Sequence, residues 1–391
     1  MHLTREEERI YNGELGWASQ ICMRILVKLG DLFGAERLIP IDSAHVSGVS
    51  YKTLGNAPTD FLKTLAESGE KTRVESTLNP KSFDPEYLGK RLPEKLLQEQ
   101  REILRAFEKM GFKQSYTCTP YHLQKVRVGA HLAWAESSAV VYANSILGAM
   151  TNREGGPSAL AAAIIGKTPD YGIHKPENRK PNILVEVDPP IKYGIEYSAL
   201  GIFLGRILKD KIPIIKGLKE LTEDKLKQLG AALASTGMTN MFYYENELRE
   251  KSGIEKVNVG RKEIENTIEQ LTTTQVPKPD LVFIGCPHCS LQEIKKIAKI
   301  VRGKKIKQEI ELWICTSRFI REKAADHINE LEKCGAKVLT DTCAVVTWTE
   351  ELGIKTIMTN SAKTAYYAPT LNKADTILAP LEECLKTALE K

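Results

Sequence analysis

The 391-residue sequence lacks the features that are typical of membrane, secreted and nucleic-acid-binding proteins. No apolar run approaches the roughly 18–20 residues that a membrane-crossing helix needs. The first ten residues, MHLTREEERI, are charged and no apolar core follows them, so we expect no secretory leader. Basic residues exceed acidic ones only by 55 to 50, without an aromatic-interleaved basic stripe. We therefore expect a cytoplasmic protein that binds neither a membrane nor nucleic acid.

The eight cysteines do not have the pattern of a disulfide framework, because their spacing is wide and the expected compartment is reducing. They also lack the close spacing of a ferredoxin fingerprint. Three of them fall in helical patterns and are expected to be small buried hydrophobes: Cys22, Cys334 and Cys384. The other five are candidates for chemistry: Cys118, Cys286, Cys289, Cys315 and Cys343.

Short apolar strands alternate with helical segments in the second half of the chain. Five runs are typical of strands: Asp280–Gly285, Glu311–Cys315, Lys337–Thr340, Lys355–Thr359 and Thr376–Leu378. A helix is expected to begin after Ser290, with Glu293 completing a capping box. Another, capped by Thr316 or Ser317, is expected to run through Cys334. This alternation predicts an α/β fold with parallel sheets that are covered by helices.

The first half is mixed and less regular. Helices are expected over Glu14–Leu32, Glu94–Met110, Glu136–Met150 and Lys219–Ala234. Strands are expected over Leu38–Asp42, Thr72–Leu78, Lys113–Thr117, Asn182–Asp188 and Ile212–Ile215. We predict an N-terminal α/β region over residues 1–245, with the substrate loops and Cys118, and a C-terminal α/β region over residues 276–391, with Cys286 and Cys343. A connecting helical segment is expected over residues 246–275.

Cysteines and polar loops follow several of the predicted strands. Cys118, Cys286 and Cys343 each come just after a strand, as do the loops around Ser47, Asn79 and Asn360. In open α/β sheets, ligands bind beyond the carboxyl ends of the strands, where helix N-termini favour negative charge. Cys315 has the same placement, so spacing alone does not exclude it. Taken singly, each of these cysteines fits an inert buried thiol better than a ligand.

Cys286-Pro-His-Cys289 is the most conspicuous local motif. A thioredoxin-like redox pair also places two cysteines at this spacing between a strand and a helix. A structural zinc site would need a second pair at similar spacing, and the sequence has none. A non-catalytic iron–sulfur or redox protein that uses Cys286 and Cys289 is therefore the alternative from another functional class.

Other polar clusters suit a small anionic substrate. They are His45–Ser50, Asn144-Ser145, Asn152-Arg153 and Asn360–Lys363. Hydroxyls, amides and a lysine are the groups that bind a carboxylate or phosphate, and a glycine lets backbone amides approach it. For any one of these clusters considered alone, turn formation and helix capping are the better explanation.

As a whole, the sequence resembles the aconitase-X family over essentially its full length. The resemblance rests on separated segments in the expected order: Glu14–Trp17, Asp42–Ser50, Thr117–Tyr121, Glu136–Ala139, Tyr142–Gly148, Thr151–Gly156, Gly285–His288, Asp341–Cys343 and Asn360–Lys363. It implies an aconitase-like arrangement of several α/β units. It also implies a [4Fe-4S] cluster with Cys118, Cys286 and Cys343 as ligands, which leaves Cys289 and Cys315 outside the set. Three thiolates can also hold a smaller cluster.

The resemblance further implies a hydro-lyase that converts (R)-5-phosphomevalonate to trans-anhydromevalonate 5-phosphate in a modified mevalonate pathway to isoprenoids. The alternative substrate within the family is cis-3-hydroxy-L-proline or another hydroxy acid. Substrate contacts are implied at Gly48, Val49, Ser50, Asn79, Pro80, Asn144, Ser145 and Lys363. A small swivelling-domain subunit, forming a heterodimer with this large chain, is expected to supply the catalytic serine, because residues 382–391 leave no room for that domain.

Overall fold

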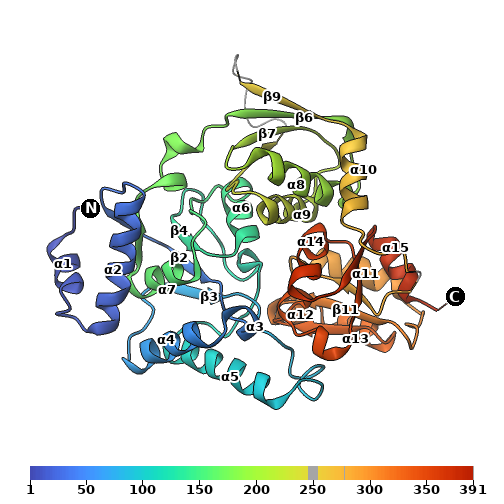
Figure 1. The fold of residues 1–391 in the computed structure, drawn as a ribbon, viewed down its shortest axis with the longest axis horizontal. Coiled ribbons are helices and arrows are strands. Elements are labelled where there is room, and N and C mark those ends of the chain that lie inside the picture. The colour runs from blue at the N-terminus through green and yellow to red at the C-terminus, as the bar shows by residue number, and fades with distance from the viewer. Residues whose placement is uncertain (245–253, 277, 391) are drawn as a thin grey trace. The chain divides into compact units, whose positions relative to one another are not determined.

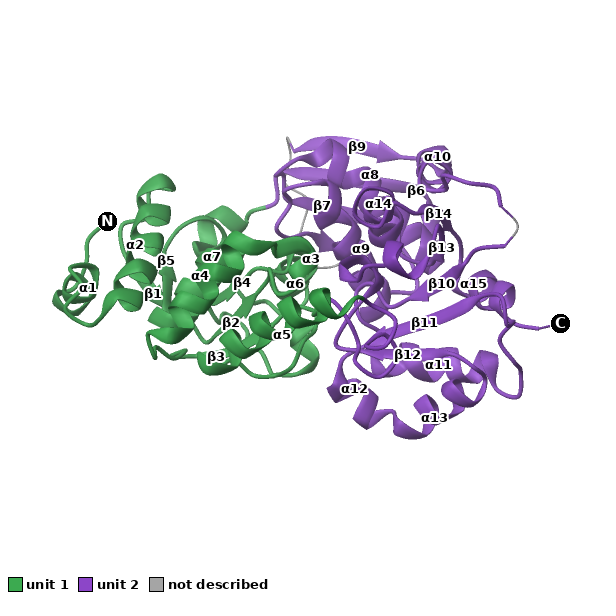
Figure 2. Cartoon of the chain, turned by 60° about the horizontal axis from the view of Figure 1, so that its bottom comes forward, with its two compact units in different colours: residues 1–81, 93–180 green, residues 82–92, 181–391 purple. Residues whose placement is uncertain are grey.

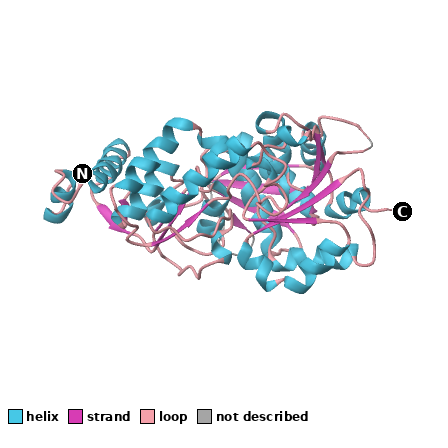
Figure 3. Cartoon of the chain, turned by 90° about the horizontal axis from the view of Figure 1, so that it is seen from below, coloured by secondary structure: helices cyan, strands magenta, loops and turns pink. Residues whose placement is uncertain are grey.

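The computed structural model describes residues 1–244, 254–276 and 278–390 (Figure 1). The chain divides into two compact units (Figure 2). Unit 1 is formed by Met1–Lys81 and Pro93–Lys180, and unit 2 by Ser82–Leu92 and Pro181–Lys391. Both units mix helices with strands (Figure 3), and the predicted α/β class with parallel sheets is confirmed. Within the described residues, no helix has the length and apolar character needed to cross a membrane.

Unit 1 is built on a three-stranded parallel sheet in the order β3-β2-β4. The central strand β2 (Ser43–Val46) is buried along its whole length, as expected for a parallel strand with both faces covered. Its neighbours are β3 (Glu75–Leu78) and β4 (Leu132–Trp134). The almost entirely apolar helix α7 (Gly156–Ile165) packs on β2 and forms the centre of the core.

The remaining elements of unit 1 surround this sheet. They are α1 (Arg5–Tyr11), α2 (Trp17–Leu32), α3 (Tyr51–Leu54), α4 (Asn56–Glu67), α5 (Glu94–Lys109), α6 (Ser137–Ser145) and the antiparallel pair β1 (Leu38–Pro40) and β5 (Lys167–Pro169). The helix expected from Glu14 begins only at Trp17, because Gly16 has a φ of 102°. The strand expected over Lys113–Thr117 is wrong, since only Tyr116 pairs there, in a single bridge to Leu78.

Unit 2 contains two parallel sheets, the first in the order β8-β7-β6-β9. Its strands are β6 (Ile183–Ile191), β7 (Pro213–Leu218), β8 (Tyr243–Tyr244) and β9 (Glu255–Val259). Helices α8 (Gly194–Leu208) and α9 (Glu223–Thr236) pack closely together, and α10 (Arg261–Gln270) packs on α8. Of the connecting segment expected over residues 246–275, positions 246–253 lie outside the described residues, and the rest holds β9 and α10.

The second sheet of unit 2 has five parallel strands in the order β12-β11-β10-β13-β14. They are β10 (Leu281–Ile284), β11 (Glu311–Thr316), β12 (Lys337–Thr340), β13 (Thr356–Thr359) and β14 (Asp375–Leu378), which confirms all five expected strands. The capping box of Ser290 and Glu293 starts α11 (Leu291–Val301). The helix expected through Cys334 is instead broken at Ala324 into α12 (Arg318–Lys323) and α13 (Ala325–Lys333). Helices α14 (Ala362–Leu371) and α15 (Leu381–Ala388) follow the last two strands.

The strand order reverses beside β10. The chain runs from β10 outward through β11 and β12, and then returns to place β13 on the other side of β10. Beside β2 in unit 1, the order reverses in the same way, with β3 on one side and β4 on the other. In open α/β sheets, the carboxyl ends of strands at such a reversal are where ligands bind.

Candidate functional site

Cys286 and Cys343 lie close together beyond the five-stranded sheet of unit 2. Cys286 follows β10 and Cys343 follows β12, and both are buried. Burial, and then the neighbouring Cys286 thiol, raise the pKa of Cys343 to about 12, while the ammonium group of Lys363 opposes this rise. Unit 2 therefore brings together two of the three predicted cluster ligands and the predicted substrate lysine.

Gly285 allows the chain to leave β10 and reach Cys286. Its φ is 115°, and a side chain there would place its first carbon 2.4 Å from the carbonyl oxygen of Cys315. Only glycine combines this backbone conformation with so close an approach. The turn that carries Cys286 therefore depends on the residue before it.

Several bonds hold the loop that carries Cys343. Asp341 has a φ of 63°, which aspartate tolerates better than most residues. Its buried carboxylate accepts hydrogen bonds from the backbone N–H of Arg318 at 2.9 Å and from Arg318 Nε at 2.6 Å. Thr347 Oγ1 lies 2.9 Å from the carbonyl oxygen of Cys343. The loop is thus fixed on both sides of the cysteine.

Asn360 and Lys363 follow β13, the strand next to β10. The hydroxyl of Ser361 accepts a hydrogen bond from the N–H of Thr364 and so begins α14. Within the described part of the chain, the buried Oδ1 of Asn360 has no hydrogen-bond partner. A buried acceptor of this kind, at the edge of the sheet that also carries Cys286, can receive a hydroxyl of a bound ligand.

Cys118 belongs to unit 1, where it lies at the carboxyl end of β3. The N–H of Thr117 donates to the carbonyl of Leu78, the last residue of that strand, at 2.8 Å. Cys118 itself is 8% exposed. Among the described residues, no three His, Cys, Asp or Glu side chains are arranged to hold a metal ion. That Cys118 completes the ligand set of Cys286 and Cys343 stays a prediction.

Cys289 and Cys315 are buried in the core of unit 2. Cys289 belongs to the hydrophobic cluster that also contains Ile294, and its backbone N–H donates to the carbonyl of Cys315 at 2.9 Å. Cys315 lies within β11 and is fully buried. These positions suit small core residues, and the exclusion of both thiols from the ligand set stays a prediction.

A hydrogen-bond network joins all three strands of unit 1 at their carboxyl ends. The His45 ring lies 2.8 Å from Thr77 Oγ1 through Nδ1 and 2.9 Å from Asn79 Oδ1 through Nε2. Asn79 Nδ2 in turn donates to Glu136 Oε2 at 2.7 Å. Because an amide oxygen can only accept, Nε2 of His45 is the donor and Nδ1 accepts from Thr77. Burial lowers the pKa of His45 to about 4, so the ring is neutral at neutral pH.

Sequence patterns alone do not reveal that His45 and Glu136 are neighbours of Asn79. The sequence pattern places His45 in a loop, whereas it lies inside β2 and is fully buried. Glu136 follows β4, and its position directly after a strand was the signal that could have identified it. Its Oε1 also accepts from the backbone and hydroxyl of Ser138 at the start of α6.

Gln100 of α5 holds the loop from Gly48 to Ser50. Gln100 Nε2 donates to the carbonyl of Val49 at 2.9 Å, and Gln100 Oε1 accepts from the N–H of Tyr51. Gly48 has a φ of 77°, which lets the loop turn toward α3. The predicted substrate loop is therefore anchored by a buried amide from another helix.

Asn144 has a structural role in unit 1. Its Nδ2 donates to the carbonyl of Thr151 at 2.9 Å, and its Oδ1 accepts from the N–H of Thr151 at 3.0 Å. Arg179 donates to the carbonyl of Asn144 at 3.0 Å. The predicted substrate contacts of Asn144 and Ser145 remain predictions, and the geometry makes Asn144 a positioning residue for the following loop.

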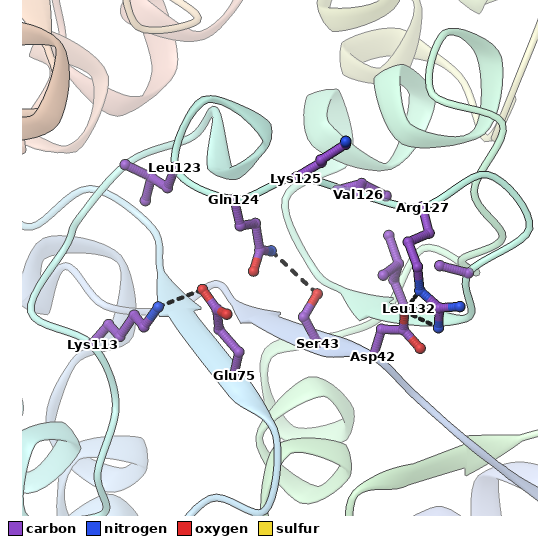
Figure 4. A pocket seen from close by; sticks show the side chains of 11 residues that line it. Asp42, Ser43, Glu75, Lys113, Leu123, Gln124, Lys125, Val126, Arg127 and Leu132 are labelled. Atoms are coloured by element: carbon purple, nitrogen blue, oxygen red, sulfur yellow. Dashed lines mark hydrogen bonds and ion pairs between the residues drawn. The ribbon is translucent and has the colours of Figure 1, made fainter.

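A pocket of about 440 Å³ lies at the opposite end of the unit 1 sheet (Figure 4). Its walls include Ser43, Glu75 and Leu132, the first residues of β2, β3 and β4. Figure 4 also shows two ion pairs in its wall, Lys113 with Glu75 at 2.5 Å and Arg127 with Asp42 at 2.7 Å. Because the pocket lies at the amino ends of these strands, it is separate from the network at their carboxyl ends.

The chain is similar to known proteins over nearly its whole length. The chain matches the aconitase X first domain over residues 1–177, the second over 181–269 and the third over 279–390. It is 47% identical to the phosphomevalonate dehydratase large subunit of Methanocaldococcus jannaschii, over 99% of this chain and 100% of that protein. It is 34% identical to the cis-3-hydroxy-L-proline dehydratase of Pseudomonas aeruginosa, over 98% of this chain and 69% of that protein.

A solved structure extends the likeness to three dimensions. The holo-form of Thermococcus kodakaraensis aconitase X is 41% identical and superposes with a TM-score of 0.92. The match covers 99% of this chain and 100% of that one. The three domains, the near-complete coverage and the shared fold lead to one conclusion: the chain belongs to the aconitase X family.

Proposed function

We propose that this chain is the large subunit of a hydro-lyase that dehydrates (R)-5-phosphomevalonate to trans-anhydromevalonate 5-phosphate, a step in a modified mevalonate pathway to isoprenoids. The observation that carries the proposal is the full-length likeness to five archaeal relatives described as phosphomevalonate dehydratase large subunit, which are 37–47% identical. The two cis-3-hydroxy-L-proline dehydratases are 31–34% identical, and the chain covers 69% of each. The higher sequence identity to the phosphomevalonate dehydratase large subunits, and the more complete coverage of their length, both favour the phosphorylated substrate.

The proposed cofactor is a [4Fe-4S] cluster held by Cys118, Cys286 and Cys343. The buried, interacting thiols of Cys286 and Cys343 support it, because soft thiolate ligands suit iron–sulfur clusters. The cation of Lys363 near Cys343 offsets part of the negative charge that two thiolates bring. When bound, the cluster supplies a Lewis-acidic iron that helps the hydroxyl of the substrate leave as water.

Residues of this chain bind and orient the substrate in this proposal. Lys363 provides a cation suited to a carboxylate or phosphate, and the loop from Gly48 to Ser50 provides backbone amides and a hydroxyl. Asn79 provides an amide whose orientation is set by His45 and Glu136. Pro80, directly after Asn79, and Ser145 complete the proposed contact set.

The elimination also needs a base that removes a proton from the carbon next to the hydroxyl-bearing carbon. We assign this base to a serine on a small swivelling-domain subunit that pairs with this chain. The description of the archaeal relatives as large subunits supports the presence of a partner subunit. The base takes the proton, the electrons of the C–H bond form the new C=C bond, and the C–O bond breaks; the leaving hydroxyl and one proton make up the water lost per turnover.

Anaerobic reconstitution with the small subunit tests the proposal. The complex is incubated with (R)-5-phosphomevalonate, and the loss of one water is followed by mass spectrometry. We expect turnover by the complex and at most a trace by either chain alone. Full activity of this chain without the partner would contradict the two-subunit site, and activity on hydroxyproline alone would contradict the substrate.

A further inference from the structure

His288 lies between the two cysteines of the Cys286-Pro-His-Cys289 loop and is fully buried. Its Nε2 lies 2.9 Å from the carbonyl oxygen of Thr342, the residue before Cys343. Because a carbonyl oxygen only accepts, the ring must carry its proton on Nε2 and donate it to that oxygen. The imidazole thus joins the loop of one predicted cluster ligand to the loop of the other.

Lys227 of α9 holds the backbone of His288. Lys227 Nζ lies 3.2 Å from the carbonyl oxygen of His288, and it forms a buried ion pair with Glu293. Glu293 also accepts from the N–H of Ser290 at 2.8 Å, at the start of α11. The side chain of Lys227 is only 2% exposed. Removing one member of such a buried pair is strongly destabilising, because the other charge is left buried and unpaired.

The loop that carries Cys343 is also held by an ion pair, as the loop that carries His288 is. The ion pair of Arg318 with Asp341, at 2.6 Å, fixes the residue before Thr342. The carbonyl that receives the His288 ring therefore belongs to a loop that is itself held in place. Each of the two loops joined by the hydrogen bond of the ring is therefore held by a second contact of its own.

We propose that His288 is a positioning residue that holds Cys286 and Cys343 at the separation that an iron–sulfur cluster requires, with Lys227 fixing the backbone that carries the ring. This inference rests on the proposed function, because the cluster is its premise. Groups that orient metal ligands change metal retention about 10- to 100-fold when they are removed. The ring is expected to act on the cluster in the same way, without contacting the substrate.

Two variants of the full chain separate the hydrogen bond from simple packing. His288→Leu fills much of the ring volume but cannot donate, whereas His288→Gln keeps an N–H donor on a side chain of similar reach. After anaerobic reconstitution, iron and sulfide content, the electron paramagnetic resonance spectrum and the rate of iron loss to a chelator are measured. We expect H288L to lose iron about 10- to 100-fold faster than wild type with an altered spectrum, and H288Q to restore much of the retention.

The opposite results would overturn the inference. Wild-type iron retention and spectrum in H288L, or equal loss in H288L and H288Q, would show that the hydrogen bond does not position the ligands. If H288L does not fold, ¹⁵N-histidine spectra of the wild-type chain decide the question, with the His288 signals assigned by their loss in H288Q. A His288 ring protonated on Nε2 and bonded to a carbonyl supports the inference, and an unprotonated Nε2 overturns it.

These measurements also separate the inference from the proposed function. None of them uses the substrate, so a wrong substrate leaves their results unchanged. A wild-type chain that takes up neither iron nor sulfide would overturn both.

Discussion

His45 Nε2 lies 2.9 Å from Asn79 Oδ1, although the two residues are 34 positions apart in the chain. The bond connects the end of β2 with the residue after β3, and Glu136 extends it to the residues after β4. A neutral, buried imidazole that donates to an amide oxygen fixes which way the Asn79 side chain faces. The relationship suggests that Asn79 works as an oriented group, and this can be tested.

Removing the carboxylate of Glu136 should weaken catalysis without removing the cluster. In Glu136→Ala, Asn79 Nδ2 loses its acceptor and can rotate away from the orientation set by His45. We expect kcat/KM to fall about 10- to 100-fold, which corresponds to about 1.4–2.7 kcal/mol of transition-state stabilisation. Glu136→Gln keeps an acceptor oxygen and should be the milder variant. Steady-state kinetics with an iron assay checks this, and unchanged kinetics in the alanine variant would refute it.

Lys363 should contribute mainly to substrate binding. In Lys363→Met the cation near Cys343 is lost while most of the side-chain length is kept. We expect KM to rise at least about tenfold, as for the loss of a charge-assisted hydrogen bond. Lys355→Met, at an exposed lysine before β13, is the matched control and should behave as wild type. A KM equal to the wild-type value in K363M would remove Lys363 from the substrate site.

Substitutions of the cysteines should fall into two groups by their effect on the iron–sulfur cluster. Serine variants of Cys118, Cys286 and Cys343 are expected to lose most of their iron and sulfide, because each removes a thiolate ligand. Cys289→Ala and Cys315→Ala remove buried core thiols and should keep the cluster, with a modest loss of stability. Iron and sulfide analysis of the purified variants decides. An intact cluster in C118S together with its loss in C289A would favour the redox-pair alternative.

The stability of unit 1 should depend on pH through its buried histidines. Burial lowers the pKa of His174 to about 3 and of His45 to about 4, and it also lowers that of His131, whose Nδ1 lies 3.0 Å from Nδ1 of His174. The unfolded chain takes up protons at its ordinary histidine pKa of about 6.5, whereas the folded chain does not. The free energy of unfolding should therefore fall as the pH drops from about 6.5 toward 4.

Each strongly shifted histidine should contribute about 1.6 kcal/mol of this loss between pH 6.5 and 5. Urea unfolding at a series of pH values measures the slope. His174→Gln removes one titrating group. The free energy of unfolding should then fall less steeply with decreasing pH, by close to the contribution of one bound proton at the lower end of this range. The same slope in wild type and H174Q would show that His174 is not held neutral by burial.

The sequence predicted the second half of the fold better than the first. The five strands β10 to β14 were identified because each is a short apolar run between helical segments, and such runs carry their own signal. The run Lys113–Thr117 is largely polar, and only its Tyr116 finds a pairing partner, in Leu78. Which segment enters a sheet also depends on tertiary pairing, and no local pattern contains that information.

The sequence indicates which residues follow strands, but it does not indicate which of these residues contact one another. Placement after strands marks Cys286, Cys343 and Lys363 as candidates, and their roles as cluster ligands and substrate contact stay predictions. That Cys286 and Cys343 approach each other, although β11 separates their strands, follows only from the folded order of the sheet. The bond from His288 to Thr342 joins residues 54 positions apart, and the bond from Asn79 to Glu136 spans 57. Such contacts depend on which strands end near one another in the folded sheets, and one sequence does not reveal this.

The most direct test of the account is a competition between substrates. The complex of this chain and its small subunit, reconstituted anaerobically, is given equal concentrations of (R)-5-phosphomevalonate and cis-3-hydroxy-L-proline, and the consumption of both is followed in one vessel. The ratio of consumption rates then equals the ratio of kcat/KM values. We predict that phosphomevalonate is consumed at least about 100-fold faster. Equal consumption, or a preference for the hydroxyproline, would contradict the proposed function.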